Sequence, residues 1–268
     1  MMKTVLKWVL LATLSLGLVA CNDSKEPKEE KHTVIKVGAT PVPHAEILEF
    51  AKPFLKAKGY ELDIVEFTDY VTPNIAVDEG ELDANFFQHL PYLEEFNKNK
   101  HTHLVKTVNV HLEPMGLYSK KIHSLNELKQ GATIAVPNDP TNESRALDIL
   151  VKQGLLSFKD VQFKTVVDIQ DNPKNLHIKE LDAPQLPRVL DEVDAAIINT
   201  NYALAANLNP LKDAIVIESK DSPYANIIVV KAGNENTPYI KALNEVLNSE
   251  VMKDFIAKKY NGAIIEAF

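Results

Sequence analysis

Short apolar runs alternate with amphipathic stretches along the chain from Thr33 onward. The apolar runs are typical of buried strands, whereas stretches such as 45–58 and 141–153 carry apolar residues at helical spacing. This alternation predicts a mainly parallel sheet with helices on both faces. The expected strands span 33–38, 62–67, 82–87, 132–136, 161–167, 195–198 and 227–230. The expected helices span 45–58, 74–79, 90–97, 141–153 and 187–191, and a long C-terminal helix begins at Thr237-Pro238.

The strand and helix pattern restarts after residue 110, which divides the chain into two α/β units. Extended, proline-containing segments near Glu113-Pro114 and Pro223-Tyr224 would join these units. We therefore expect an α/β fold with two lobes and a ligand cleft between them. The first lobe is predicted to be discontinuous, with residues 33–114 plus 224–268, and the second to span 115–223. A single larger doubly wound sheet is the alternative.

The first twenty-one residues combine a basic head with a short apolar run. Lys3 and Lys7 precede the run Trp8–Ala20, which is shorter than the about 20 residues needed to cross a bilayer but fits a signal peptide. Cys21 follows it and is the only cysteine, so no intramolecular disulfide is possible. This ending resembles a bacterial lipobox, which predicts removal of residues 1–20 and lipidation of Cys21. The alternative is an ordinary secretory signal.

The remaining composition narrows the range of partners. The formal charge is −8, and losing Lys3 and Lys7 leaves roughly −10, which disfavours nucleic acid as a partner. Residues 21–32 are charged and almost free of apolar side chains after the cysteine, so we interpret them as a flexible tether. The expected location is the cell envelope, with the chain anchored by lipid to the membrane and facing the periplasm or cell exterior.

Signatures of catalysis are scarce in this sequence. It has no Gly-x-Ser-x-Gly elbow, P-loop or dinucleotide-binding glycine motif, and no His-x-x-x-His or cysteine cluster for a metal. We therefore expect neither an enzyme nor a cofactor or metal site. The enzyme alternative is an envelope hydrolase with His89 as base, for which no nucleophile motif is present. A surface lipoprotein that acts in adhesion is a further alternative.

A cluster of rings follows the third expected strand. Phe86, Phe87, His89 and Tyr92 lie within seven residues around a proline-containing turn. The carboxyl ends of strands are where open α/β sheets place their ligand sites. The rings could therefore form an aromatic box around a soft or apolar group, and the alternative is a hydrophobic seam between helix and sheet. Tyr70, in the loop after the second strand, could be either a lid or ordinary packing.

Polar residues at a helix start suggest a site for a carboxylate. Asn142 lies at the start of the expected helix 141–153, where backbone N–H groups and the helix dipole favour an anion. Arg145 lies one turn further and can form a bidentate pair with a carboxylate. The alternative is a surface ion pair between Arg145 and Asp148 or Glu143, which contributes little stability.

Two further asparagines lie beside expected strands. Asn199 follows the strand 195–198, and Asn226 precedes the last strand near the presumed hinge. Asparagine is common in turns for purely local reasons. Its amide can also accept a hydrogen bond from a ligand ammonium while it donates to a carboxylate.

Eight motifs in this order resemble a known family. After the lipobox they read VGATPVPHAEIL, DYVTPN, DANFFQHLPYL, VPNDPTN, NPKNLHIKELDAPQLPR, INTNYA and SPYANIIVV. This series resembles the methionine-binding lipoproteins of bacterial ABC importers, the MetQ or NlpA lipoprotein family, over essentially the whole mature chain. Val42 is a departure, because glycine is frequent in the family between the two prolines.

The resemblance implies a periplasmic-binding-protein-like fold whose two lobes close on free L-methionine. The partners would be an importer permease and its ATPase, and the chain would be a monomer. Arg145 would bind the carboxylate, the aromatic box the thioether, and Asn199, Asn142 or Asn226 the ammonium. Another amino acid, a methionine derivative or a short peptide is the alternative ligand. The implied ligand-binding residues are Tyr70, Phe86, Phe87, His89, Tyr92, Asn142, Arg145, Asn199 and Asn226.

Overall fold

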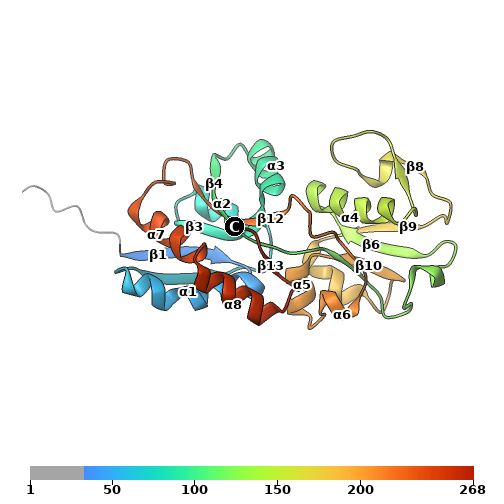
Figure 1. Ribbon diagram of the computed structural model, residues 1–268. Helices are drawn as coiled ribbons and strands as arrows, with labels where there is room; N and C mark the ends of the chain where they lie inside the picture. The colour runs from blue at the N-terminus through green and yellow to red at the C-terminus, as the bar shows by residue number, and fades with distance from the viewer. Residues whose placement is uncertain (1–32) are drawn as a thin grey trace, which may run out of the picture. The chain divides into compact units, whose positions relative to one another are not determined.

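Two mixed β-sheets with helices on both faces make up the described part of the chain (Figure 1). The computed structural model describes residues 33–268, so the predicted signal peptide, the lipidation site at Cys21 and the tether 21–32 lie outside the described residues. The described chain falls within one compact unit. Between residues 33 and 268, none of the helices combines the length and the apolar character needed to cross a bilayer.

The first sheet has six strands in the order β13-β4-β12-β3-β1-β2. They are β1 (Val34–Ala39), β2 (Glu61–Glu66), β3 (Ala84–His89), β4 (Leu104–Leu112), β12 (Ala225–Lys231) and β13 (Ile265–Glu266). Strand β1 is parallel to β2 and β3, whereas β12 is antiparallel to β3 and β4. Within this sheet, the prediction of parallel pairing therefore holds for β1, β2 and β3 and is wrong for the pairings of β12 and β13. Strand β12 enters from the second sheet, and that return path reverses its direction.

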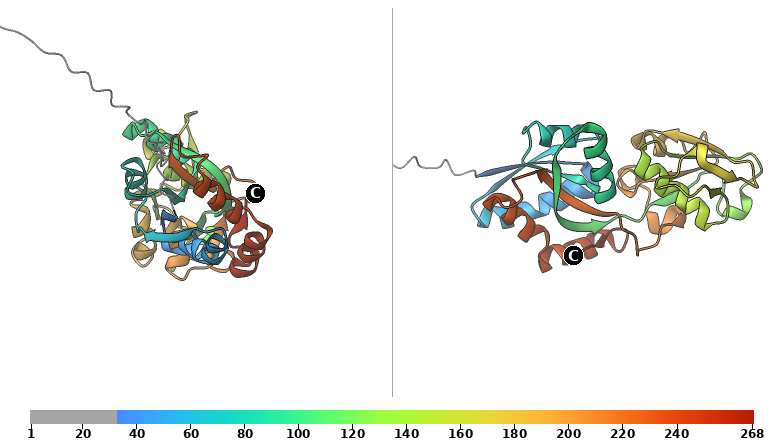
Figure 2. Two further views of the ribbon diagram at one scale, coloured as in Figure 1. Left: turned by 90° about the vertical axis from the view of Figure 1, so that its left-hand side faces the viewer. Right: turned by 90° about the horizontal axis from the view of Figure 1, so that it is seen from above.

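Helices cover both faces of this sheet, as predicted (Figure 1, Figure 2). One face carries α1 (Glu46–Ala57), α7 (Pro238–Leu247) and α8 (Glu250–Tyr260), and the other carries α2 (Thr72–Asp78) and α3 (Leu90–Lys100). The short π-helix η1 (Pro41–Ala45) leads into α1. The expected single C-terminal helix is divided in two, because the Ser249 side chain accepts a hydrogen bond from the Met252 N–H and starts α8.

The second sheet has five strands in the order β11-β5-β10-β6-β9. They are β5 (Gly116–Tyr118), β6 (Thr133–Pro137), β9 (His177–Leu181), β10 (Ala195–Ile198) and β11 (Ala214–Ile217). All of them lie between β4 and β12 in the sequence, so the chain leaves the first sheet after β4 and returns before β12. Strand β6 is parallel to β9 and β10, in agreement with the predicted parallel sheet, whereas β5 is antiparallel to β10 and β11. The sequence pattern predicted β6 and β10 and missed the short strands β5, β9 and β11.

Helix α4 (Pro140–Lys152) packs on one face of the second sheet, and α5 (Thr200–Ala205) with the 3-10 helix η4 (Ala183–Val189) packs on the other. The smaller elements are η2 (Leu125–Glu127), β7 (Ser157–Phe158), η3 (Val166–Asp168), β8 (Ile169–Asp171) and α6 (Pro210–Asp213). The predicted strand 161–167 is wrong. Val167 in that run is 79% exposed, so its apolar residues do not form a buried strand. The expected helix 187–191 is replaced by η4.

Candidate ligand-binding site

A cavity lies where the end of β3, the first turns of α4 and α5 and the start of β12 meet. Its empty volume is about 340 Å³, part of it open to solvent. The lining residues are Tyr70, Phe87, Gln88, His89, Tyr92, Glu113, Asn142, Arg145, Asn199, Thr200, Asn201 and Asn226. The structure thus brings together every residue of the predicted ligand set except Phe86.

Aromatic rings form one wall of the cavity. The ring centroid of Phe87 lies 5.8 Å from that of Tyr70 and 6.0 Å from that of Tyr92. The hydroxyl of Tyr92 donates to the backbone carbonyl of Tyr70 at 2.8 Å, and the hydroxyl of Tyr70 donates to Asn201 Oδ1 at 2.7 Å. Since both hydroxyls are engaged, the rings are held in place and present apolar surface to the cavity.

Phe86 does not belong to this wall, which corrects the prediction from sequence. Its side chain is 0% exposed and packs against the rings of His44 and His111, at centroid distances of 4.6 and 5.2 Å. Successive residues of a strand point to opposite faces, so Phe86 and Phe87 cannot share one wall. The register with β12 also shifts beside Phe87, so that Gln88 pairs with Ile227 and Phe86 with Ile228.

A chain of hydrogen bonds fixes the orientation of the amides in the cavity. The carboxylate of Asp139 caps α4 and accepts from the backbone N–H of Asn142 at 3.0 Å and from its Nδ2 at 2.9 Å. A carboxylate accepts only, so Asn142 must turn its Oδ1 the other way. That oxygen accepts from Asn199 Nδ2 at 2.8 Å and from His89 Nε2 at 3.2 Å. Asn199 Oδ1 is left as a buried acceptor without a partner in the described chain.

His89 is a neutral member of the same network. Its Nδ1 accepts from the backbone N–H of Tyr92 at 3.3 Å, which leaves the proton on the Nε2 that faces Asn142. Burial, with the positive charge of Arg145 acting in the same direction, lowers the pKa of His89 to about 3. The ring is therefore uncharged at neutral pH and acts as a positioning group for Asn142.

Arg145 is held by a buried carboxylate from a distant segment. Its Nε lies 3.0 Å from Glu218 Oε1, its Nη2 also donates to Glu218, and Nη2 donates to the backbone carbonyl of Glu113 at 2.7 Å. The guanidinium carbon lies 4.4 Å from the ring centroid of Tyr224. Only Nη1 has no hydrogen bond within the described residues, and this nitrogen is left to meet a ligand.

The ion pairs considered from sequence do not form. Asp148 pairs instead with Lys164, at 2.7 Å, and Glu143 accepts from the backbone N–H of Val166. Because Glu218 is 73 positions from Arg145, no local spacing could identify it. The structure therefore replaces a weak surface pair with a buried one.

Four lining residues are missing from the sequence-based set, namely Gln88, Glu113, Thr200 and Asn201. Two of them have a local signal, because Thr200 and Asn201 continue the run that contains Asn199. Gln88 belongs to a buried amide cluster with Asn74 and Asn85, which ties α2 to β3. Glu113 follows β4, and no pattern in its neighbourhood distinguishes it.

A second buried cluster lies directly behind Asn226. The Oδ1 of Asn226 accepts from His44 Nε2 at 3.0 Å, which leaves its Nδ2 without a partner in the described chain. Burial lowers the pKa of His44 to about 4 and that of His111 to about 3. Burial also raises the pKa of Glu113, against the opposing effect of His44 and Arg145.

Comparison with known proteins adds to this geometry. The family model described as NlpA lipoprotein matches residues 35–268. The methionine-binding lipoprotein MetQ of Bacillus subtilis strain 168 is 45% identical over 273 residues, with 98% of each chain covered. The structure of a nutrient-binding protein from Burkholderia cenocepacia bound to methionine is 48% identical, with a TM-score of 0.85 and coverage of 87% of this chain and 100% of that one. An ABC transporter periplasmic substrate-binding protein from Coxiella burnetii is 44% identical, with a TM-score of 0.84 and coverage of 87% and 100%.

Proposed function

The chain belongs to the NlpA lipoprotein family, and on this basis we propose that it is a lipid-anchored receptor that binds free methionine and delivers it to an ABC importer. Its likeness to the methionine-binding lipoprotein of Bacillus subtilis and to the methionine-bound Burkholderia protein supports this choice of ligand. Its likeness to the Coxiella protein supports the link to an ABC transporter. The activity is binding rather than catalysis.

One observation carries the proposal of an amino-acid ligand, namely that unused donors and an unused acceptor line the same cavity. Arg145 Nη1 and Asn226 Nδ2 can only donate, which suits a carboxylate. Asn199 Oδ1 can only accept, which suits an ammonium. A free α-amino acid carries both groups on one carbon. We assign the carboxylate to Arg145 and Asn226 and the ammonium to Asn199.

The aromatic wall suits the methionine side chain. Tyr70, Phe87 and Tyr92 offer ring surface, and sulfur–aromatic contacts contribute about 0.3–1.5 kcal/mol each. Burial of the side chain adds about 1.5–3 kcal/mol, and hydrogen bonds to charged groups add about 1.5–3 kcal/mol each. After ordering costs, a few such contacts reach the roughly 8 kcal/mol of micromolar binding.

The anchor and the delivery step complete the proposed function. We propose that the lobes comprise residues 33–114 with 224–268 and residues 115–223, that they close on the ligand, and that closure distinguishes the loaded from the empty receptor. Lipidation of Cys21 would hold the monomeric chain at the membrane surface of the cell envelope, where the permease and its ATPase take up the ligand.

Calorimetric titration with L-methionine tests the proposal. The protein is first unfolded and refolded to remove any ligand acquired during expression, and native mass spectrometry before that step identifies what was bound. Saturable one-to-one binding of L-methionine at micromolar concentration or below is expected. A folded protein that gives no heat with L-methionine but binds another amino acid, D-methionine or a methionyl peptide would assign the receptor to that ligand instead.

A further inference from the structure

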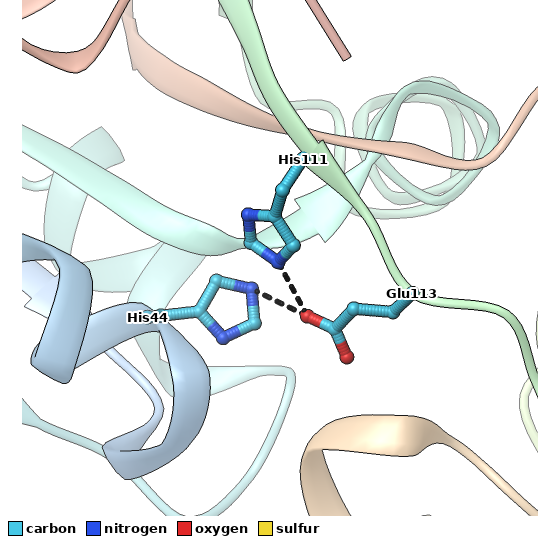
Figure 3. A group of neighbouring side chains, drawn as sticks. All are labelled: His44, His111 and Glu113. Atoms are coloured by element: carbon cyan, nitrogen blue, oxygen red, sulfur yellow. Dashed lines mark hydrogen bonds and ion pairs between the residues drawn. The ribbon is translucent and has the colours of Figure 1, made fainter. Parts of the chain in front are cut away.

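His44, His111 and Glu113 converge on one point beside the cavity (Figure 3). Glu113 Oε1 lies 2.7 Å from His111 Nε2 and 3.2 Å from His44 Nε2. His44, in η1, is brought by the fold to a pair of residues two positions apart, His111 at the end of β4 and Glu113 just after it. All three are buried, with exposures of 1%, 0% and 5%.

From this convergence we propose that His44, His111 and Glu113 form a binding site for a divalent transition-metal ion of the zinc type. The three donor atoms lie within 4.8 Å of one another. Donor atoms around one zinc ion, each about 2.0–2.2 Å from the metal, are about 3–4 Å apart, so small side-chain movements suffice. Two imidazole nitrogens and one carboxylate oxygen are a donor set that zinc commonly takes.

Surrounding groups complete the site. Asn226 Oδ1 lies 3.0 Å from His44 Nε2 and supplies a fourth metal ligand, which is an oxygen. The hydroxyl of Thr40 lies 2.7 Å from His44 Nδ1. When the metal takes the place of the proton on Nε2, the ring proton moves to Nδ1 and is donated to Thr40, whose hydroxyl can accept as well as donate. Such an outer-shell bond holds a ligating imidazole in its orientation.

A metal ion can reach the cluster from the cavity, and the pairing of the nearby charged groups leaves Glu113 available to it. Glu113 and Asn226 line both the cluster and the cavity, so an ion can reach the cluster from the cavity without opening the core. Arg145 is paired with Glu218, so its side chain does not occupy the Glu113 carboxyl. Within the described residues no lysine or arginine side chain is bonded to that carboxyl, which leaves its oxygens available to a cation.

Zinc titration of the full chain tests the site. All variants carry Cys21→Ser, so that the one thiol of the sequence cannot bind the metal, and all are stripped with a chelator. Calorimetry with ZnCl₂, with MgCl₂ as the hard-cation comparison, is performed on this background and on Glu113→Gln and His111→Gln. His101→Gln is the matched control, because His101 is an exposed histidine of the same chain. Thermal unfolding of each variant establishes that it is folded.

One zinc ion per chain is expected, with little response to magnesium. Affinity should fall at least tenfold in Glu113→Gln and His111→Gln and stay unchanged in His101→Gln. Glu113→Gln keeps the shape of the side chain, so it remains informative if His111→Gln fails to fold. Crystals grown with zinc should show anomalous scattering between His44 and His111 at the zinc edge. Absence of zinc binding, or equal affinity in Glu113→Gln and His101→Gln, would overturn the site.

Discussion

Glu218 holds Arg145 in a buried bidentate pair, although the two residues are 73 positions apart in the sequence. The side chains are only 3% and 6% exposed. The pair fixes the guanidinium plane and leaves Nη1 as the nitrogen that can meet a ligand carboxylate. The arginine is thereby oriented before any ligand arrives, which reduces the ordering cost of binding.

Removal of Glu218 should destabilise the protein strongly. Glu218→Ala leaves the guanidinium of Arg145 buried without its counter-charge, and such losses cost about 3–5 kcal/mol in the free energy of unfolding. The exposed pair Lys120–Asp191, at 2.7 Å, is the control, and Asp191→Ala should cost less than about 1 kcal/mol. Urea unfolding at pH 7 measures both. Equal costs in the two variants would mean that Arg145 does not depend on Glu218.

Removal of the unused acceptor should weaken methionine binding. Asn199→Ala eliminates Oδ1, and loss of one hydrogen bond to an ammonium corresponds to about 1.5–3 kcal/mol, or roughly 10- to 150-fold in the dissociation constant. Asn248 is the matched control, because its Oδ1 is also buried without a partner but lies at the end of α7, away from the cavity. Calorimetry should show unchanged affinity in Asn248→Ala. Unchanged affinity in Asn199→Ala as well would remove the ammonium role.

Substitution of the two adjacent phenylalanines should have different consequences. Phe87→Leu removes a ring from the cavity wall and should weaken methionine binding by about 0.3–1.5 kcal/mol, or roughly two- to tenfold. Phe86→Leu should lower the free energy of unfolding, because Phe86 lies in the core of the first sheet, and should leave affinity unchanged. Calorimetry and urea unfolding separate the two effects. A larger loss of affinity in Phe86→Leu would contradict the assigned faces.

Acid sensitivity should depend on His89. The folded state holds the pKa of His89 at about 3, whereas an unfolded histidine titrates near about 6.5. The stability that the neutral, buried His89 contributes is therefore present above about pH 6.5. It is lost as the pH falls toward 3, because only the unfolded state takes up the proton. His89→Gln should reduce the loss of unfolding free energy between pH 7 and pH 5 by about 2 kcal/mol.

The difference in pH dependence between the parent protein and His89→Gln reports the titration of His89 separately from that of other groups. The lowered pKa values of His44 and His111 act in the same direction, and the raised pKa values of Glu113 and Asp139 act in the opposite one. These contributions are common to the parent and the variant, so they cancel in the difference. An unaltered slope in His89→Gln would show that this ring titrates normally.

The sequence by itself determined many of the elements and the order of the site residues. Apolar spacing located α1, α3, α4 and the strands β1, β3, β6, β10 and β12, since burial on one face leaves a periodic record in the sequence. The motifs identified residues that line the cavity, because a strand end or a helix start brings each of them there. The signal peptide and the lipidation of Cys21 remain predictions from sequence, outside the described residues.

The tertiary structure alone decided the direction of β12, the phenylalanine that faces the cavity and the partners of the polar side chains. The antiparallel direction of β12 depends on how the chain returns from the second sheet, and the face of β3 that is turned toward the cavity decided that Phe87 rather than Phe86 lines it. The pairing of Glu218 with Arg145 depends on contacts between distant segments. The same is true of the hydrogen bond from Asn199 to Asn142, which leaves Asn199 Oδ1 without a partner in the described chain. Periodicity reports burial along one segment, whereas these properties depend on which segments meet.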